Sequence, residues 1–354
     1  MPTNRFSFFS ARERRNKKTN NKKTLDNIIL CIVLYVDFNT KEIVMQNRKR
    51  IPIFYASDEK YMPYLAVALA SLKEYKSAEF DYKIHVLYTG DLNGYSKKIK
   101  EMEEENLTIQ FVDVTEEIDR IRDCMICRDY YTPAIYYRLL IPELFPQYDR
   151  ALYMDCDTVA LTDVAELYNI DIQENYIGAV ADQAVASVPE FCEYTKNALG
   201  IDWKRYFNSG VIVMNLQKFR EVKFYEKFGA VLRSYNFIIA PDQDVLNLIC
   251  KDKVCYYDGG WNKMPIAGED MEKPKLIHYN LTMKPWHYDG VLYEEYFWHF
   301  AAKTEFLEVI KQAKASFTPE MAQRDAEGGK KLIALAQSEA DNPSNFIRSV
   351  GMPF

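Results

Sequence analysis

The chain has 354 residues, of which 48% are hydrophobic, and its formal net charge at pH 7 is −6. This length provides a sizeable buried core, in one large domain or two small ones, and the acidic balance argues against a nucleic-acid-binding protein. The seven cysteines are scattered. Apart from a single CxxC at Cys124 and Cys127, none has the paired spacing of a zinc site, so we expect reduced thiols in a cytosolic protein.

The amino-terminal stretch has the composition of a non-globular extension. Residues 1–23 contain eight basic residues and one acidic residue, and an apolar run follows at 28–36. This run is too short for a spanning helix, which needs about 20 residues, and no small-residue cleavage site follows it. We expect residues 1–50 to be a basic extension. Met45 is a second candidate start, so residues 1–44 need not belong to the working protein.

From Ile51 onward, apolar runs alternate with helical repeats. Strands are predicted at 51–55, 83–88 and 107–114, and helices at 61–75, 95–105 and 136–144. This alternation indicates a parallel sheet covered by helices. No G-x-G-x-x-G or P-loop motif follows these strands, which argues against a nicotinamide-dependent dehydrogenase and a P-loop nucleotidase.

The second half combines short strands with loops and ends in helices. Strands are predicted at 176–181, 211–214 and 275–277, and a helix begins at Val245 after a Pro- and Asp-containing start signal. Beyond Trp298 the pattern is helical and charged, with a break at Gly328-Gly329 and a loose tail at 342–344. The 297–311 region has the spacing of an amphipathic membrane-surface helix, although packing within the protein is favoured because Glu305 and Glu308 interrupt it.

Between 151 and 161, an apolar run ends in two carboxylates, Asp155 and Asp157. In an extended chain, residues i and i+2 point to the same side, so the two side chains converge. Their repulsion is relieved by a hard divalent cation, and the alternative is an ordinary solvated turn. His278 follows a predicted strand and is a candidate third ligand, which favours Mn²⁺ over Mg²⁺. Asp58 also follows a strand, so it is expected to face the same crevice.

Seven short segments, in order, resemble glycosyltransferase family 8, the retaining nucleotide-sugar transferases that include glycogenin and bacterial lipopolysaccharide glucosyl- and galactosyltransferases. The resemblance implies an α/β fold of GT-A type: a Rossmann-like nucleotide-binding half and a mixed central sheet flanked by helices, in a domain at 51–300, plus a C-terminal helical tail at 301–354. The segments are FYASD at 54–58, YYRL at 136–139, LYMDCD at 152–157, GAVAD at 178–182, YFNSGV at 206–211, DQDVLN at 242–247, and HY through KPW at 278–286.

The resemblance also implies roles for twelve residues, with Mn²⁺ or Mg²⁺ as cofactor, UDP-glucose or UDP-galactose as donor, and a glycan or lipid-linked glycan as acceptor. It points to bacterial cell-surface polysaccharide synthesis in the cytoplasm or at the inner membrane face. Peripheral membrane contact and homo-oligomer formation stay open. The roles are uridine binding by Ala56, Asp58 and Tyr61, metal ligation by Asp155, Asp157 and His278, diphosphate contact by Lys284, and donor-sugar contact by Arg138, Asp182, Asn208 and Asp242, with Gln243 closest to the anomeric carbon.

Retention of configuration is expected from same-face attack, because Gln243 is a poor nucleophile; Asp242 as a nucleophile is the alternative. The family often has a glycine between its counterparts of His278 and Lys284, and residues 280–283 contain none, which leaves the loop geometry open. Lys60 stands where some members have a smaller polar residue, so no nucleotide contact is assigned to it. Two competing interpretations remain. One is a haloacid-dehalogenase-type phosphatase, since the segment at 155–159 resembles the Asp-x-Asp motif of that class. The other is a non-catalytic or self-glycosylating relative of the transferases.

Overall fold

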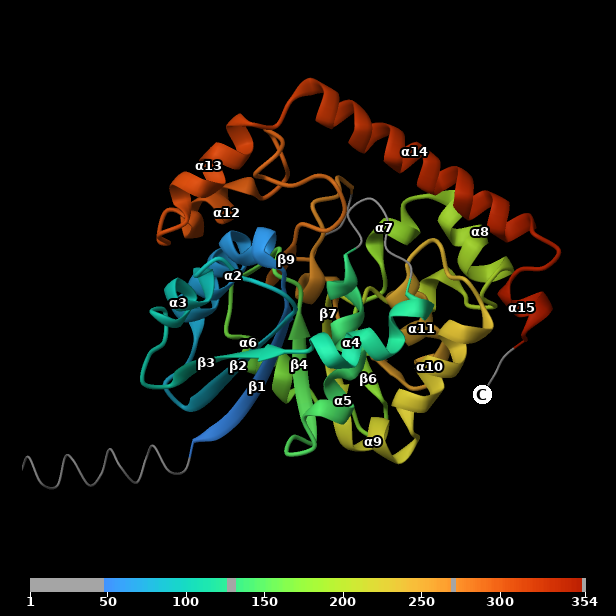
Figure 1. Cartoon of the computed structure of the whole chain (residues 1–354), viewed down its shortest axis with the longest axis horizontal. Helices are drawn as coiled ribbons and strands as arrows, with labels where there is room; N and C mark the ends of the chain where they lie inside the picture. Colours follow the sequence, from blue (N-terminus) through green and yellow to red (C-terminus); the bar gives the residue numbers. More distant parts are fainter. Residues whose placement is uncertain (1–47, 126–131, 269–271, 352–354) are drawn as a thin grey trace, which may run out of the picture. The chain divides into compact units, whose positions relative to one another are not determined.

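The computed structural model describes residues 48–125, 132–268 and 272–351 (Figure 1). The chain from Arg50 onward forms one compact unit. The predicted extension at 1–50 lies almost wholly outside the described residues, as does Cys127 and with it the CxxC pair. Four cysteines of the described part, Cys156, Cys192, Cys250 and Cys255, are free thiols. The division at residue 300 stays a prediction.

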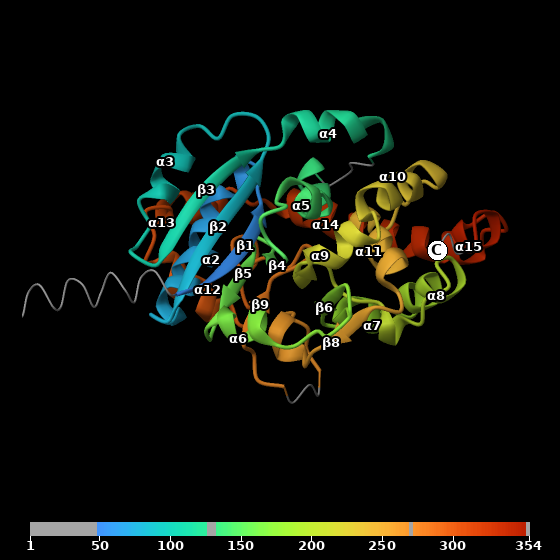
Figure 2. The same cartoon turned by 90° about the horizontal axis from the view of Figure 1, so that it is seen from below.

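A seven-stranded mixed sheet runs through this unit in the order β3-β2-β1-β4-β7-β6-β8. Neighbours are parallel in β2/β3, β1/β4 and β6/β8, and antiparallel in β4/β7 and β6/β7. Figure 2 shows β3, β2 and β1 side by side. The predicted mixed sheet flanked by helices is therefore confirmed. The strands are β1 (Lys49–Ala56), β2 (Phe80–Tyr88), β3 (Leu107–Asp113), β4 (Arg150–Met154), β6 (Ile177–Ala179), β7 (Val211–Asn215) and β8 (Val254–Tyr256).

The central strands are buried on both faces and divide their side chains between two cores. On β4, Leu152 and Met154 join one hydrophobic core, while Ala151 and Tyr153 join the other. This follows from the two-residue repeat of a strand, which sends successive side chains to opposite faces. A strand covered on both faces reads as a continuous apolar run. The chain immediately after β4 is therefore held firmly between two packed layers.

Helix α2 (Met62–Tyr75) is enclosed within the first core. Every residue from Met62 to Leu72 is buried, as expected of a helix that is apolar nearly all round. Ser71 on α2 accepts a hydrogen bond at its Oγ from the amide nitrogen of Ala160 at 2.9 Å. This contact ties α2 to the short strand β5 (Thr158–Ala160), so the chain on both sides of the Asp-x-Asp turn is anchored.

A second, two-stranded sheet brings distant parts of the chain together. Strand β5 pairs antiparallel with β9 (Leu276–His278), and Thr158 lies opposite His278. This register brings His278 close to Asp157, which immediately precedes Thr158 in the chain. The sequence predicts the end of β9 but not its pairing with β5, because three-residue strands carry too little pattern to define a partner.

Most predicted elements are present, with shifted boundaries. Helix α11 begins at Pro241 rather than Val245, because proline suits the first turn and acidic groups favour a helix amino terminus. The helix predicted at 95–105 ends at Lys100, and much of 136–144 is a 3₁₀ helix. The remaining elements before α11, with one after it, are η1 (Glu59–Tyr61), α3 (Tyr95–Lys100), α4 (Thr115–Ile121), η2 (Arg122–Cys124), η3 (Pro133–Leu140), α5 (Ile141–Leu144), α6 (Val164–Asn169), α7 (Gln183–Ala186), α8 (Pro189–Asn197), η4 (Trp203–Arg205), α9 (Leu216–Glu221), α10 (Phe224–Ser234) and η5 (Gly259–Asn262).

The C-terminal region is helical as predicted and 297–311 packs within the protein as favoured, but two details, the break at Gly328-Gly329 and the loose tail, were wrong. No break occurs at Gly328-Gly329, since α14 (Pro319–Asp341) runs through both glycines. The 297–311 region is not one helix but parts of α12 (Glu294–Ala301) and α13 (Leu307–Ala315), and its residues Phe297 and Ile310 are buried in the core. The tail after 342 is not loose, because α15 (Phe346–Ser349) follows. Among the described residues, no helix combines the length and apolarity needed to cross a bilayer.

Candidate active site

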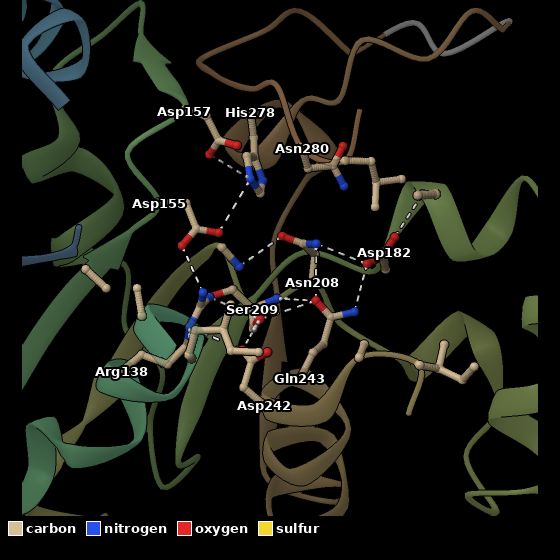
Figure 3. Close-up of a pocket in the computed structure, with 18 of the residues that line it drawn as sticks. Arg138, Asp155, Asp157, Asp182, Asn208, Ser209, Asp242, Gln243, His278 and Asn280 are labelled. Atoms are coloured by element: carbon tan, nitrogen blue, oxygen red, sulfur yellow. Dashed lines mark hydrogen bonds and ion pairs between the residues drawn. The ribbon is translucent and has the colours of Figure 1, made fainter. Parts of the chain in front are cut away.

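One cavity of about 220 Å³ opens at the carboxyl ends of β1 and β4, which are parallel neighbours. All twelve side chains singled out from the sequence line it. The expectation that Asp58 and the acidic pair face one crevice is confirmed. Figure 3 shows how the polar side chains at its centre converge from separate elements.

Asp155 and Asp157 occupy the turn between β4 and β5. The amide nitrogen of Asp155 donates to the carbonyl oxygen of Gly210 at 2.8 Å, and the carbonyl oxygen of Asp157 accepts from the amide nitrogen of Tyr279 at 2.9 Å. With the backbone fixed at both residues, the carboxylates approach the ring of His278. Its Nε2 lies 3.6 Å from Oδ2 of Asp155 and 3.3 Å from Oδ1 of Asp157.

The other nitrogen of His278 is held by Asn262. Nδ1 of His278 lies 2.9 Å from Oδ1 of Asn262, whose own Nδ2 donates to Oδ1 of Asn208 at 2.9 Å. Because Nδ2 of Asn262 is the donor, its Oδ1 must accept, and the proton of the histidine belongs on Nδ1. The lone pair on Nε2 is then directed toward the two carboxylates, as in histidines that bind metals.

These three residues fit a divalent cation. One ligand atom from each lies within 4.8 Å of the others, and Oδ1 of buried Asp157 has no hydrogen-bond donor. A buried carboxylate oxygen without a partner costs free energy unless a cation satisfies it. Gly210 leaves the space open: a Cβ there would lie 2.6 Å from Oδ2 of Asp155. The donor set of two carboxylates and one imidazole suits Mn²⁺ or Mg²⁺.

Lys284 supplies the positive charge beside this cluster. Its ammonium group, which is buried, is paired with Oδ2 of Asp157 and donates to the carbonyl oxygen of Tyr279. Burial alone would raise the pKa of Asp157, but attraction to the ammonium group of Lys284 outweighs it and holds that pKa well below its ordinary value. Asp157 is therefore ionised and available as a ligand throughout the physiological range.

Arg138 links the acidic pair to α11. Its Nη2 lies 2.9 Å from Oδ1 of Asp155, and its Nε lies 3.2 Å from Oδ2 of Asp242. The guanidinium group lies over the ring of Tyr153, whose hydroxyl donates to Asp155 at 2.7 Å. Burial raises the pKa of Asp242, and Arg138 opposes that effect. Arg138 thus compensates two carboxylates that would otherwise be costly to bury.

A second polar group faces the cavity on the side away from Asp157 (Figure 3). Oδ2 of Asp182 accepts hydrogen bonds at 3.0 Å from both Nδ2 of Asn208 and Nε2 of Gln243. Oε1 of Gln243 in turn accepts from the amide nitrogen of Ser209 at 2.9 Å. Both ends of the Gln243 amide are therefore engaged, and its orientation is fixed by its neighbours.

Asp244, next to Gln243, anchors the first turn of α11. Its carboxylate accepts from the hydroxyl groups of Tyr194 at 2.8 Å and Tyr206 at 2.6 Å. Burial raises the pKa of Asp244 to about 7, against the lowering effect of these hydrogen bonds. This network joins α8 to α11 and fixes the helical turn that carries Gln243.

Ala56, Asp58 and Tyr61 line the cavity at the end of β1. Oδ1 of Asp58 accepts from the amide nitrogen of Tyr61 at 3.1 Å and caps η1. A structural role as a helix cap thus accounts for one oxygen of Asp58. Oδ2 of Asp58 has no hydrogen bond among the described residues, so it is available to accept one from a ligand.

Sequence reasoning missed Asn262, which orients His278. Asn262 lies in η5 after Gly259-Gly260, and no motif surrounds it. Ser209 and Tyr153 stand inside quoted motifs, but no role was assigned to them. Their contacts depend on packing between strands and helices that a local pattern does not contain.

Comparison with known proteins gives a consistent result. The profile of Glycosyl transferase family 8 matches residues 52–290. The chain belongs to this family. Because the match covers the acidic pair, His278 and Lys284, family 8 membership excludes the phosphatase interpretation.

Two curated relatives align over most of the chain. A lipopolysaccharide 1,2-glucosyltransferase of Escherichia coli K12 is 26% identical over 255 residues, 66% of this chain and 72% of the relative. General stress protein A of Bacillus subtilis is 25% identical over 285 residues, 74% of this chain and 96% of the relative. Among solved structures, the galactosyltransferase LgtC with donor and acceptor sugar analogues has a TM-score of 0.62 and 24% identity, covering 72% of this chain and 96% of LgtC. The fold is accordingly of GT-A type.

The loop between His278 and Lys284, which lacks the glycine often found in the family, still contains a left-handed residue. Leu281 adopts a left-handed backbone conformation, with φ at +56°, between His278 and Lys284. Glycine takes this conformation readily, whereas a leucine is strained there. The side chain of Leu281 is 40% exposed and lines the cavity. The loop therefore contains a left-handed turn although residues 280–283 include no glycine.

Proposed function

We propose that the protein is a metal-dependent, retaining glycosyltransferase that moves glucose or galactose from a UDP-sugar to a glycan or lipid-linked glycan. One observation carries the proposal: the Asp155–Asp157–His278 cluster, with an unpartnered buried oxygen, shares a cavity with the hydrogen-bonded group of Asp182, Asn208 and Gln243. The relatives named as a lipopolysaccharide glucosyltransferase and a galactosyltransferase support this class of sugar and of acceptor.

The donor is assigned along the length of the cavity. Uridine is assigned to the end formed by Ala56, Asp58 and Tyr61, where the ring of Tyr61 provides a stacking surface and Oδ2 of Asp58 an acceptor for the uracil edge. The diphosphate is assigned beside Lys284, whose buried ammonium group is paired with Asp157 of the acidic pair. The hexose then extends toward Gln243.

Asp155, Asp157 and Nε2 of His278 are the groups that would hold the divalent cation. When bound, Mn²⁺ or Mg²⁺ supplies electrostatic stabilisation of the negative charge that develops on UDP. Lys284 adds a second positive charge at the same place. Arg138 neutralises the far oxygen of Asp155 and so limits repulsion between that carboxylate and Asp242.

The residues at the sugar end favour attack on the same face. In this step the bond between the anomeric carbon and the diphosphate oxygen breaks, and the acceptor hydroxyl forms its bond on that face. The proton of the acceptor passes to the departing phosphate oxygen. Gln243 is a neutral amide, and Asp242 is engaged by Arg138 and by the Ser209 hydroxyl at 3.2 Å, so neither resembles a free nucleophile. Asp182 and Asn208 are assigned to sugar hydroxyls.

The test is UDP release from a panel of UDP-sugars, in Mn²⁺, in Mg²⁺ and after chelation. Many transferases hydrolyse their donor slowly, so the acceptor need not be known. We expect metal-dependent release from one hexose donor and its loss in Asp157→Asn, which keeps the size of the side chain but removes the charge. Asp252→Asn is the matched control, since Asp252 is exposed and does not line the cavity. Equal release by both variants, or release that ignores the metal, would contradict the proposal.

A further inference from the structure

The end of the cavity beyond Gln243 differs in chemistry from the end with the charged groups. It is formed by α7, α8, residues 239 and 240, and α14. Its apolar surface comes from Val185, Phe191, Ile239 and Leu332. Within the described chain, none of the lining residues that these four elements contribute is charged.

The polar atoms at this apolar end already have partners inside the protein. The hydroxyl of Tyr194 donates to Asp244 at 2.8 Å, and the hydroxyl of Thr195 donates to the carbonyl oxygen of Cys192 at 3.0 Å. Their hydrogens are thus unavailable to a ligand. A molecule placed here meets hydrocarbon and aromatic surface, in contrast to the Asp182–Asn208–Gln243 group at its edge.

Helix α14 covers this end and is fastened on both sides of it. Oδ2 of Asp325 accepts from the hydroxyl of Tyr288 at 2.9 Å, and Glu339 accepts from the hydroxyl of Tyr235. Between these contacts, Leu332 reaches the cavity. Figure 1 shows α14 running from the side of α13 to α8, against which it packs. The apolar end is therefore a subsite that α14 covers on one side.

We propose that this subsite binds an apolar aglycone, an alkyl or aryl group carried by the acceptor sugar. The inference rests on the proposed transferase activity, and it names the class of acceptor. A donor does not account for the subsite, because uridine, diphosphate and hexose are polar and are matched by the polar part of the cavity. The subsite is continuous with Gln243, so a glycoside seated there presents its sugar to the reacting centre. Leu332 lies outside residues 52–290, so the cover is a feature of this chain beyond the family match.

Matched methyl and hexyl β-glycosides of glucose and galactose test the inference. Each is titrated into the UDP-release assay with the accepted donor, and the concentration that gives half of the change in rate is measured. Each buried methylene contributes a factor of about 4 in affinity. The five extra methylenes of a hexyl chain, even if only partly buried, are expected to lower this concentration by about 10-fold or more.

Variants separate the subsite from the donor site. Leu332→Asn and Phe191→Asn are expected to remove most of the hexyl advantage while donor hydrolysis without glycoside is unchanged. Met321→Asn is the control, because Met321 is an exposed residue of the same helix. If wild type hydrolyses the donor but responds equally to methyl and hexyl glycosides, or to neither, the inference is overturned and the transferase proposal stands. Absence of donor hydrolysis in wild type would overturn both.

Discussion

At the scale of single residues, the site depends on side chains that orient other side chains. Asn262 is buried and has no charge, yet its amide connects His278 to Asn208. Through these two hydrogen bonds, the proposed metal ligand and the proposed sugar-binding residue are set by one group. A substitution that removes the Asn262 amide should therefore affect both His278 and Asn208.

We expect Asn262→Ala to raise the Mn²⁺ concentration needed for half-maximal UDP release by about 10–100-fold, the usual effect of removing a partner of a ligating histidine. Asn262→Asp keeps an acceptor for Nδ1 of His278 and should recover part of the loss. Titration of Mn²⁺ against both variants measures the effect. A fall in maximal rate with no change in the metal requirement would instead indicate that Asn262 serves only the sugar end.

Motif reasoning reached the residues that carry charge and missed those that position them. Asp155, Asp157 and His278 each follow a predicted strand, so a local pattern reveals them, and the family resemblance added Lys284. Asn262 lies in a segment without such a pattern, and its role appears only when β9 and η5 are folded against each other. The left-handed backbone of Leu281 was likewise beyond prediction, because leucine gives no signal for it.

At the scale of elements, α14 shows how tertiary contacts override local propensity. Each glycine in a helix interior costs about 1 kcal/mol relative to alanine, which is why two in a row predict a break. The helix continues because Thr318 caps its start and because contacts with Tyr288 and α8 hold it on both sides of Gly328. No local sequence pattern predicts that α8 packs on α14, because the two helices are far apart in the chain.

We predict that Gly328→Ala and Gly329→Ala each raise the free energy of unfolding by about 0.5–1 kcal/mol. A Cβ at either position would meet nothing within 4 Å. Urea unfolding followed by circular dichroism measures the change. Gly210→Ala is the opposing control, because its Cβ would lie 2.3 Å from Cε1 of His278, and we expect a loss of about 1–3 kcal/mol. A loss of stability in the α14 variants would mean that the helix needs its glycines for close packing.

At the scale of the whole molecule, the predictable part of the fold is the part built from long periodic segments. The strand and helix alternation between Ile51 and Val114 and the buried strand at 150–154 follow from composition and repeat. The antiparallel insertion of β7 beside β4, and the pairing of β5 with β9, join residues far apart in the chain. These pairings bring His278 and Asn208 to the acidic pair. Residue type and position made His278 a candidate third ligand, whereas only the family resemblance assigned Asn208 to the same site.

The central claim is that one cavity holds a metal, a diphosphate and a hexose in line between Asp58 and Gln243. A crystal structure with UDP and Mn²⁺ bound tests it most directly. We expect Mn²⁺ bonded to Asp155, Asp157 and Nε2 of His278, at about 2.0–2.3 Å, with the ammonium group of Lys284 on a phosphate oxygen instead of on Asp157. Binding of UDP elsewhere, or of UDP in this cavity with Lys284 still paired to Asp157 and no metal at the cluster, would contradict the account.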